Sequence, residues 1–498
     1  MNDFILLLPE IIMTAAAFLV ITLDIIWKGD ERSLTVLPWI AFGAAMAAIL
    51  ATLWTFQAAS VDFAVATDAG NLVPMLAVDP MALFFKILAA LTVALVGLSA
   101  VDYLRIHTPF RGEFYGLTLL AGLSLMLMSS ATNLVMIYLA VEFLSITSYI
   151  LTAYLRTDAR STEAGLKYLL YGAVASGVML YGFSLLYGAT GSVDLARIAS
   201  QLPETATLPL IITAVILILT GLGFKIALVP FHQWSPDAYE GAPTPITAFL
   251  SVGPKVAGFA VLIRILTVAL PAYDLNWTAI LVVISILTMT VGNLVALWQT
   301  NIKRLLAYSS IAQAGYMLVG LAAWSAQVSS GPLTLAGGVN GILLYLFAYL
   351  FTNLGLFAVV IILENKMGTA NIADYAGLIR RSPFLSIALL VFFLSLIGIP
   401  PTGGFMGKLF VFGAAIDQGL YALALIGVFN SVISVYYYFG IARQVFFGEA
   451  EDESPIQPGL VMNAVVTVTM VITLLIALYG QPFINFADNS AKILAAAF

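Results

Sequence analysis

Four charged side chains stand deep inside long apolar stretches of this 498-residue chain: Glu142, Lys225, Lys255 and Lys408. A charge near the middle of a bilayer costs on the order of 3 kcal/mol, so such groups usually face the interior of a helix bundle or a wet cavity. Carboxylates and amines can also take up and release protons. The residue types and their depth therefore predict a path for protons through a membrane protein.

Lys225 and Lys255 lie on either side of an interruption in the seventh apolar segment. This segment starts near Leu208 and meets Pro230, which removes a backbone donor and breaks the helix. A new apolar helix then carries Lys255 roughly 16 Å along its axis, at a rise of about 1.5 Å per residue. Irregular backbone at this depth is tolerated only against protein or water. We therefore expect both amines near mid-membrane in the protein interior.

His232 follows the same interruption, seven residues after Lys225. Its imidazole can change charge near neutral pH, and irregular backbone inside a membrane needs hydrogen-bond partners. The sequence leaves two roles open for His232, a proton relay and a cap on the broken backbone.

Glu142 lies about 15 Å into the apolar run LVMIYLAVEFLSITSYILTAYLR, too deep for a short acid to reach the surface. A buried carboxylate needs a partner or a proton. If the partner is Lys225, each group favours the charged form of the other, and a proton that reaches the lysine is felt by the acid. A static buried ion pair is the alternative.

Lys408 comes just after a second interruption, IGIPPTGGFMGK, which repeats the arrangement of the seventh segment. It is the one acidic or basic side chain expected deep in the second half of the chain, beside neutral groups such as Gln313, Tyr345, Tyr349 and Asn353. Desolvation makes the charged form of a lone lysine costly, which suits an amine that both takes up and releases a proton. The alternative is a lysine that stays charged as a fixed electrostatic element.

The composition is that of a polytopic membrane protein, with 61% hydrophobic and only 9% charged residues. The chain has no cysteine, which excludes disulfides and cysteine-bound iron–sulfur clusters, and its two histidines leave little for haem or zinc. We expect no cofactor and no metal in this chain. Its expected surroundings are the lipid bilayer and other proteins, with no nucleic acid.

About fourteen apolar segments are long enough to cross a membrane, so we predict an all-α polytopic membrane protein. The segments run approximately over 4–27, 34–57, 80–103, 113–130, 132–155, 163–188, 207–229, 244–269, 276–298, 302–323, 334–363, 384–417, 420–446 and 457–480. The twelfth segment is long because it contains the second interruption.

Basic residues gather in the loops after odd-numbered segments, whereas the loops after even-numbered segments offer little beyond Arg197. The basic set is Lys28, Arg32, Arg105, Arg111, Arg156, Arg160, Lys303, Arg304, Lys366, Arg380, Arg381 and Arg443. By the positive-inside rule these loops face the cytoplasm and both termini face outward, which is the periplasmic side of a bacterial inner membrane.

The two interruptions lie five segments apart, which indicates two related units formed by helices 4–8 and 9–13. Because five is odd, the units have opposite orientations in the membrane. Inverted repeats with interrupted helices are typical of ion-coupled transporters. Within a single membrane domain, 1–498, we assign residues 1–110 to helices 1–3, 111–270 to the first unit, 271–448 to the second unit and 449–498 to helix 14.

Other charged residues fit ordinary structural roles. Arg264, near the end of the eighth segment, is expected to extend its side chain to the membrane surface. Glu163 and Lys167 have the spacing of an ion pair within one helix. For Lys86, the sequence leaves open an inward-pointing amine and a position at the interface.

Four stretches of the chain resemble the antiporter-like membrane subunits of respiratory complex I, the proton-pumping NADH–quinone oxidoreductase. They are FRGEFYGLTLLAGLSLMLMSSATNLVMIYLAVEFLSITSYILTAYLR, FKIALVPFHQWSPDAYEGAPTPITAFLS, NIKRLLAYSSIAQAGYMLVG and SLIGIPPTGGFMGKLFVF. The run YEGAPTPITAFLS and the number of apolar segments are most similar to the subunit N branch of that family.

The resemblance implies a subunit that moves protons within the membrane arm of the complex. NADH oxidation and quinone reduction, with their flavin and iron–sulfur clusters, would then take place in partner subunits. The resemblance also implies a central charged axis made by the helix-5 glutamate and the lysines of helices 7, 8 and 12, which fall on Glu142, Lys225, Lys255 and Lys408. Gln313 departs from the family, in which histidine is frequent at this position, and weakens a proton-transfer role for helix 10.

Two other functions fit parts of the pattern. A subunit of a multisubunit sodium/proton antiporter resembles the same family and would use the same lysines without a redox partner. A stand-alone secondary transporter would need a solute site, and the sequence shows no such constellation beyond the proton-type groups. The similarity to subunit N favours the complex I function over both.

Overall fold

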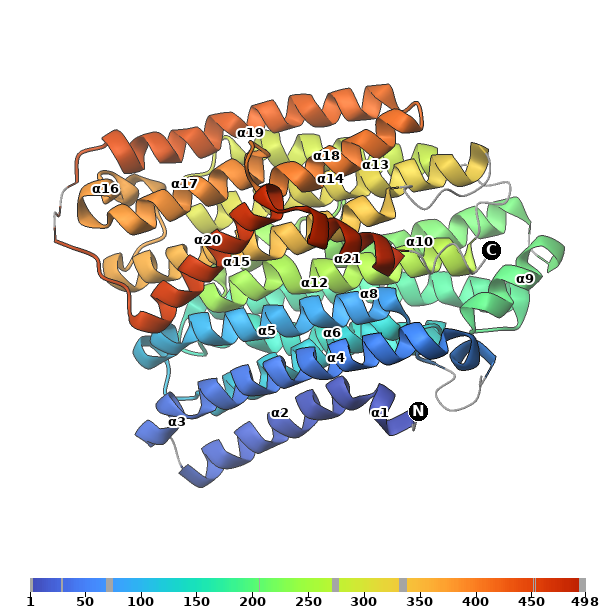
Figure 1. Cartoon of the computed structure of the whole chain (residues 1–498), viewed down its shortest axis with the longest axis horizontal. Helices are drawn as coiled ribbons and strands as arrows, with labels where there is room; N and C mark the ends of the chain where they lie inside the picture. Colours follow the sequence, from blue (N-terminus) through green and yellow to red (C-terminus); the bar gives the residue numbers. More distant parts are fainter. Residues whose placement is uncertain are drawn as a thin grey trace.

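The computed structural model describes residues 3–27, 30–68, 75–205, 207–270, 277–330, 338–450, 452 and 454–491. Lys28 lies outside these ranges. Within them the chain is a bundle of helices whose long axes run in nearly the same direction (Figure 1), and the extended pairing is limited to isolated β-bridges between loops.

The helices follow one another along the chain in four groups. The first group is α1 (Asp3–Leu6), α2 (Leu8–Trp27), α3 (Glu31–Thr35), α4 (Leu37–Asp68) and α5 (Pro80–His107). The second is α6 (Gly112–Ser130), α7 (Leu134–Thr152), α8 (Ala159–Thr190), α9 (Leu195–Thr205), α10 (Leu208–Ile226), α11 (Trp234–Gly241), α12 (Thr244–Arg264) and the π-helix η1 (Ile265–Ala269). The third is α13 (Trp277–Ala296), α14 (Ile302–Ser330), α15 (Val339–Met367), the 3₁₀ helix η2 (Ile372–Tyr375), α16 (Leu378–Arg381), α17 (Pro383–Ile397), α18 (Gly403–Asp417) and α19 (Tyr421–Phe447). The last is α20 (Leu460–Leu478) and α21 (Gln481–Ala491).

Thirteen helices in the described ranges are long and apolar enough to cross a membrane. The shorter apolar helix α17 continues after a break as α18, and α10 is likewise followed after a break by α11. Counting α17 with α18 as one interrupted span gives the predicted fourteen. The all-α polytopic fold with interrupted helices 7 and 12 is therefore confirmed.

Two five-helix units show the same pattern of packing. In the first unit α6 packs on α7 and on α12, and α8 packs on both halves of the interrupted helix, α10 and α11. In the second unit α13 packs on α14 and on α19, and α15 packs on both α17 and α18. Because the matching helices are five positions apart, they cross the bundle in opposite directions.

Both interrupted helices end in the same way. Ala227, after α10, has a φ of 63°, and its N–H donates to the Gly223 and Phe224 carbonyls. Gly398, after α17, has a φ of 91°, and its N–H donates to the corresponding carbonyls of Leu394 and Ser395. A left-handed residue with such bonds is a common helix end. Alanine in this conformation costs on the order of 1 kcal/mol, and strain of this kind concentrates at functional sites.

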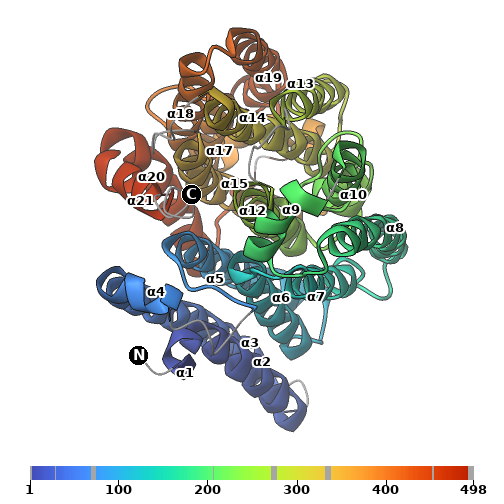
Figure 2. The same cartoon turned by 90° about the vertical axis from the view of Figure 1, so that its right-hand side faces the viewer.

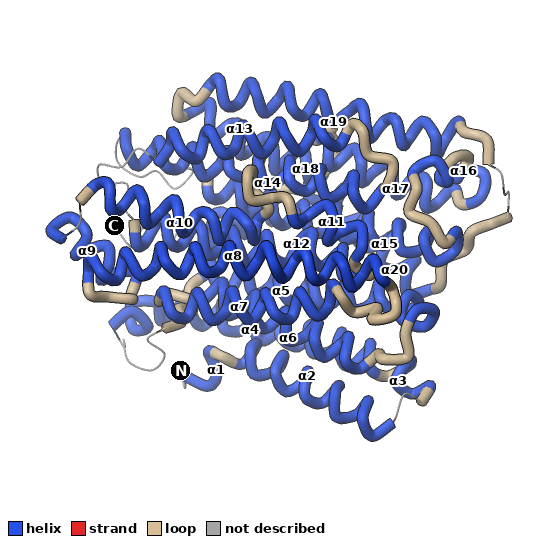
Figure 3. Tube along the Cα trace, turned by 180° about the vertical axis from the view of Figure 1, so that it is seen from behind, coloured by secondary structure: helices blue, strands red, loops and turns tan. Residues whose placement is uncertain are grey.

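The centre of the bundle is formed by α12 and α15, one from each unit (Figure 2). Every residue of α12 is buried, and α15 is buried from Val339 to Leu363 except for Phe347. Seen from behind (Figure 3), α8 and α10 cover α12 on this side. Polar groups on α12 and α15 are therefore enclosed by protein from the first unit to the second.

The basic loops meet at one end of the bundle, which we call the basic face. There, Tyr154 of the α7–α8 loop binds the Phe110 carbonyl of the α5–α6 loop, and Asn301 forms a β-bridge with Asn371. The loops of the other end pair separately, for example through the bridge between Asn133 and Asp194. The sequence pattern of basic loops thus corresponds to one surface of the fold.

Candidate functional site

Lys225 lies in the last turn of α10, directly before the break, and only 1% of its surface is exposed. Its Nζ has no hydrogen-bond partner among the described residues. The aromatic rings of Tyr149, Tyr168 and Phe224 surround it, with centroids 5.7, 5.8 and 5.6 Å from Nζ. Ring faces attract a cation more weakly than a carboxylate does. The amine is therefore held in the interior without a fixed counter-ion.

Glu142 is the charged group whose electrostatic attraction reaches Lys225. The two side chains share no hydrogen bond, and Oε1 of Glu142 is buried without a hydrogen-bond partner. Glu142 is half-buried because it lies on the outward face of α7, in line with Leu139 and Ile146, which are 56% and 55% exposed. Glu142 and Lys225 therefore share no direct hydrogen bond, and their coupling stays a prediction.

Lys255 makes a hydrogen bond to the carbonyl end of the seventh helix, where that helix is interrupted. It lies on α12, 1% exposed, and its Nζ donates to the carbonyl of Ile226 at a distance of 2.8 Å. Ile226 is the last residue of α10, so its carbonyl has lost the partner that a continuing helix would provide. Gly258, one turn further on, allows the close approach, because a Cβ there would lie 2.6 Å from Ile226 Cγ1.

Lys408 closes the second break by the same means. It lies on α18, 5% exposed, and its Nζ donates to the carbonyls of Leu396 and Ile397 at 3.1 and 2.8 Å. Nζ also donates to Ser431 Oγ at 3.0 Å and lies 4.1 Å from the centre of the Tyr316 ring. In each unit a buried lysine therefore binds the carbonyl end of the helix before the break, from α12 in the first unit and from α18 in the second.

His232 lies in the turn between α10 and α11 and is half-buried. Its ring Nδ1 is buried without a hydrogen-bond partner among the described residues, so a role in capping the broken backbone stays a prediction. A relay role for His232 also stays a prediction.

A row of neutral polar groups on one face of α15 lies between the two units. Its members are four residues apart, one helical turn, and are Tyr345, Tyr349 and Asn353. Their side chains donate to three groups on α14 and α12, in order Gln313 Oε1, Ser310 Oγ and Ser251 Oγ. Ser251 lies one turn before Lys255, so the row begins beside one buried lysine.

Gln313 joins this row to the other lysine. Its Nε2 donates to the Leu396 carbonyl at 3.0 Å, the same oxygen that accepts a hydrogen bond from Lys408. An amide cannot carry the proton as a charged group, but it fixes the position of the carbonyl that Lys408 binds. The spacing of the polar residues on α15 was visible in the sequence, whereas their partners on α14 and α12 were not.

Comparison with known proteins agrees with this geometry. Residues 131–434 match the family model described as NADH:quinone oxidoreductase/Mrp antiporter, TM. NADH-quinone oxidoreductase subunit N 2 of Chloroherpeton thalassium is 41% identical, over 98% of this chain and 94% of the relative. Subunit N of Heliobacterium modesticaldum is 44% identical over 84% of this chain and 86% of its own length. The chain belongs to the subunit N family.

Solved structures share the fold of this subunit N family member. A chain of respiratory complex I from Thermus thermophilus is 32% identical, with a TM-score of 0.77 over 96% of this chain and 98% of that one. A chain of the Mrp complex from Dietzia sp. has a TM-score of 0.82, over 98% of each chain, at 22% identity, a likeness of fold alone. Sequence similarity thus favours subunit N over the antiporter.

Two further charged residues in this subunit N family member, Arg264 and Lys86, have clear partners. The prediction that Arg264 reaches the membrane surface is wrong, since it is 4% exposed and donates to both carboxylate oxygens of Asp79 at 2.7 and 3.1 Å. Because α5 and α6 cover this end of α12, the arginine pairs inside the protein. Lys86 points inward and lies 2.7 Å from buried Glu10.

The ion pair between Glu163 and Lys167 within α8 is confirmed, at 2.9 Å. Lys167 also contacts Asp237 of α11 at 2.9 Å, so it links α8 to the short helix after the break. The sequence did not identify this second partner, because it lies seventy residues further along the chain.

Proposed function

We propose that this chain translocates protons in the membrane arm of an NADH–quinone oxidoreductase, as a subunit without a redox centre of its own. Flavin, iron–sulfur clusters and the site of quinone reduction belong to partner subunits. The observation that carries the proposal is the set of buried lysines at two equivalent breaks, joined by polar groups between the units. Family membership supplies the reaction that drives it.

Near the breaks, the surroundings of each lysine allow both the charged and the neutral form of its amine. Lys225 has an aromatic pocket and a distant carboxylate, so the free energy of its charged form depends on Glu142. Lys255 and Lys408 bind carbonyl oxygens, which stabilise an ammonium and still accept a hydrogen bond from a neutral amine. The free energy of proton binding is therefore expected to differ only moderately between the lysines, so that no single site holds the proton permanently.

The position of Glu142 supports a neighbouring subunit at α7. Exposed leucine and isoleucine side chains above and below it would be stable in lipid, but a carboxylate would not. We infer that another membrane subunit covers this face, with Glu142 between its surface and Lys225.

By the positive-inside rule, we propose that the basic face lies in the cytoplasm and that both termini lie in the periplasm.

Co-purification tests the complex directly. When the chain is tagged and extracted in mild detergent, flavin- and iron–sulfur-containing subunits should accompany it, and the preparation should oxidise NADH with a quinone. A preparation that holds antiporter subunits and exchanges sodium for protons without a redox partner would establish the rival function.

Glu142 is expected to set the affinity of Lys225 for its proton through charge. An attraction of about 1.4 kcal/mol between two charged groups changes a protonation equilibrium by about tenfold. Glu142→Gln and Glu142→Ala should lower proton pumping by this order, whereas Glu142→Asp should retain part of it. Pumping in membrane vesicles, normalised to the amount of assembled complex, measures the series. Equal activity in the three variants would favour a static carboxylate.

A further inference from the structure

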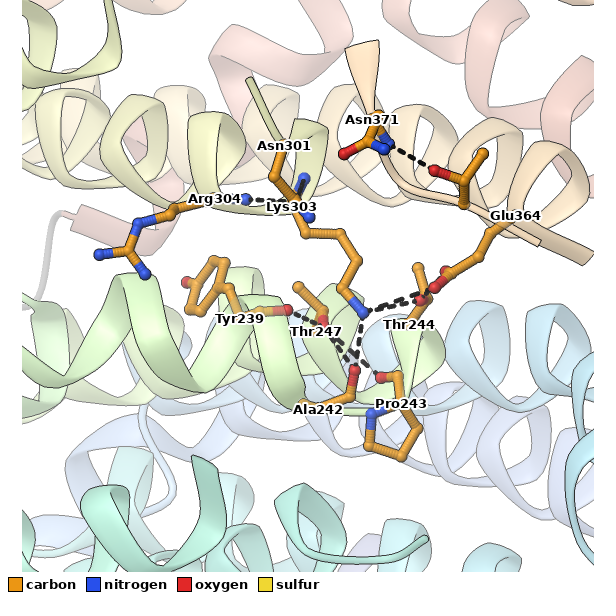
Figure 4. Close-up of polar contacts among 11 residues, drawn as sticks. Tyr239, Ala242, Pro243, Thr244, Thr247, Asn301, Lys303, Arg304, Glu364 and Asn371 are labelled. Atoms are coloured by element: carbon orange, nitrogen blue, oxygen red, sulfur yellow. Dashed lines mark hydrogen bonds and ion pairs between the residues drawn. The ribbon is translucent and has the colours of Figure 1, made fainter. Parts of the chain in front are cut away.

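A buried ion pair lies where the two units meet at the basic face (Figure 4). Lys303, in the first turn of α14, donates through Nζ to the Ala242 carbonyl at 3.0 Å and to Thr244 Oγ1 at 3.3 Å. The same Nζ lies 3.7 Å from Glu364 Oε1, and the Thr244 hydroxyl donates to Glu364 Oε2. The side chains of Lys303 and Glu364 are 6% and 19% exposed. The carboxylate is thus the member of the group that still reaches solvent.

Lys303 is the cation that contacts Glu364 among the described residues. The groups that face it from the elements packed around it are Tyr103 of α5, Thr244 of α12, Lys303 of α14 and Tyr375 of η2. Arg304, next to Lys303, points the other way (Figure 4). It binds Asp237 and Glu240 at 2.6 and 3.0 Å. Lys303 and Glu364 therefore form a pair separate from the larger ion cluster of α11.

A polar face of α12 leads from this pair toward Lys255. It consists of Thr244, Thr247, Ser251 and Lys255, which are spaced by three or four residues and are at most 1% exposed. The first and last lie roughly 16 Å apart along the helix, at a rise of about 1.5 Å per residue. A hydroxyl can accept a proton at one lone pair and donate its own. The face thus offers a donor and acceptor at each turn.

Contacts from other helices keep this face polar along its length. Thr247 Oγ1 donates to the Tyr239 carbonyl at 2.8 Å, and the Tyr239 hydroxyl donates to the Leu250 carbonyl at 3.2 Å. Ser251 Oγ accepts from the Asn353 amide. These groups come from α11 and α15, so the face lies in the seam between the two units. No described acidic or basic side chain lies on it between Thr244 and Lys255.

We propose that Glu364, with Thr244 and Lys303, forms the site where protons are taken up from the basic face, and that Thr247 and Ser251 pass them to Lys255. This inference rests on the proposed function. A proton from solvent binds a Glu364 oxygen and neutralises the carboxylate, while Lys303 keeps its bond to the Ala242 carbonyl. The proton then passes along the hydroxyls, through water between one helical turn and the next, to the neutral amine of Lys255, and Glu364 regains its charge.

A structural clamp is the competing explanation, because an ion pair between the units could serve only to hold them together. Buried ion pairs are weak contributors to stability as such. Thr247 and Ser251 make no direct hydrogen bond to Lys303 or Glu364, although Thr247 Oγ1 lies 3.5 Å from the Ala242 carbonyl that Lys303 also binds. The two explanations therefore differ in what happens when these hydroxyls alone are removed.

The test compares variants of the assembled complex in membrane vesicles. Glu364→Gln is expected to lower proton pumping by about a hundredfold, the lower end of what a proton-transfer group contributes, and Glu364→Asp should restore much of it. The double variant Thr247→Val with Ser251→Ala leaves the ion pair intact and should lower pumping at least about tenfold, as a partial loss of proton transfer. Thr52→Val is the matched control, because Thr52 is equally buried and binds only its own helix.

Normal pumping in the double variant, with Glu364→Gln reducing only the amount of assembled complex, would overturn the proposal in favour of the clamp. Lys225→Ala, made in parallel, separates this result from failure of the proposed function. If Lys225→Ala is inactive while Glu364→Gln pumps normally, the uptake site is wrong and proton translocation by this chain stands. If both pump normally, the proposed function itself is wrong.

Discussion

Replacing Lys225 with alanine is expected to abolish most coupled proton pumping while the complex still assembles. The amine has no hydrogen bond that holds the fold together, so its removal leaves the helix break and its carbonyl cap in place. What is lost is the group whose charge Glu142 can influence. Proton-transfer groups contribute about a hundredfold or more, and the pumping rate should fall by at least that factor.

Two controls separate the loss of the amine from the loss of volume. Lys225→Met keeps the length of the side chain between the three aromatic rings but has no proton to exchange, so it should be as inactive as alanine. Lys366→Ala removes an exposed lysine from the basic face and should pump normally. Recovery of pumping in the methionine variant would show that packing in the aromatic pocket matters, and that proton exchange at Lys225 does not.

The sequence predicted the spans and the breaks because both follow from local chemistry. Long apolar runs need no knowledge of their neighbours to be recognised, and Pro230 and the Pro400–Pro401 pair interrupt a helix wherever it lies. The depth of the four charged residues was readable for the same reason. The two-unit arrangement followed from counting helices between the breaks.

The partners of those charged residues could not be read from the sequence. Arg264 and Asp79 are 185 residues apart, and Lys303 and Glu364 are 61 residues apart in the sequence. Arg264 looked like an interfacial residue and Lys303 like an ordinary loop residue, because the distance from a helix end is all that a hydropathy pattern reveals of a charged side chain. Their burial depends on which helices cover which loop, and that is a property of the assembled bundle.

The hydrogen bonds from Lys255 and Lys408 to the carbonyl ends of the broken helices were only partly predictable from the sequence. A broken helix inside a membrane must leave carbonyls without partners, and Lys225, Lys255 and Lys408 near the breaks were possible donors. The sequence did not say which of these amines binds which carbonyl end. It said even less about Glu142, whose position on the outward face of α7 depends on the register of the helix against α6 and α8.

Lys408→Arg is expected to be nearly as inactive as Lys408→Ala, and this comparison decides how the second unit works. The contacts of Lys408 make the alternative a serious one, since two carbonyls, a serine hydroxyl and the Tyr316 ring would all stabilise a permanent positive charge. Arginine keeps that charge but cannot release its proton in a protein. A relay therefore fails in both variants, by about a hundredfold, whereas a fixed charge survives in one.

The measurement is proton pumping by the assembled complex, with Ser431→Ala as the matched control. That change removes one hydrogen bond from Lys408 Nζ, worth about 1 kcal/mol, and leaves the amine and both carbonyls in place. It should therefore reduce pumping by no more than about fivefold, since about 1.4 kcal/mol corresponds to a tenfold change. If Lys408→Arg pumps as well as Ser431→Ala does, the proton does not pass through Lys408, and the lysine acts by its charge alone.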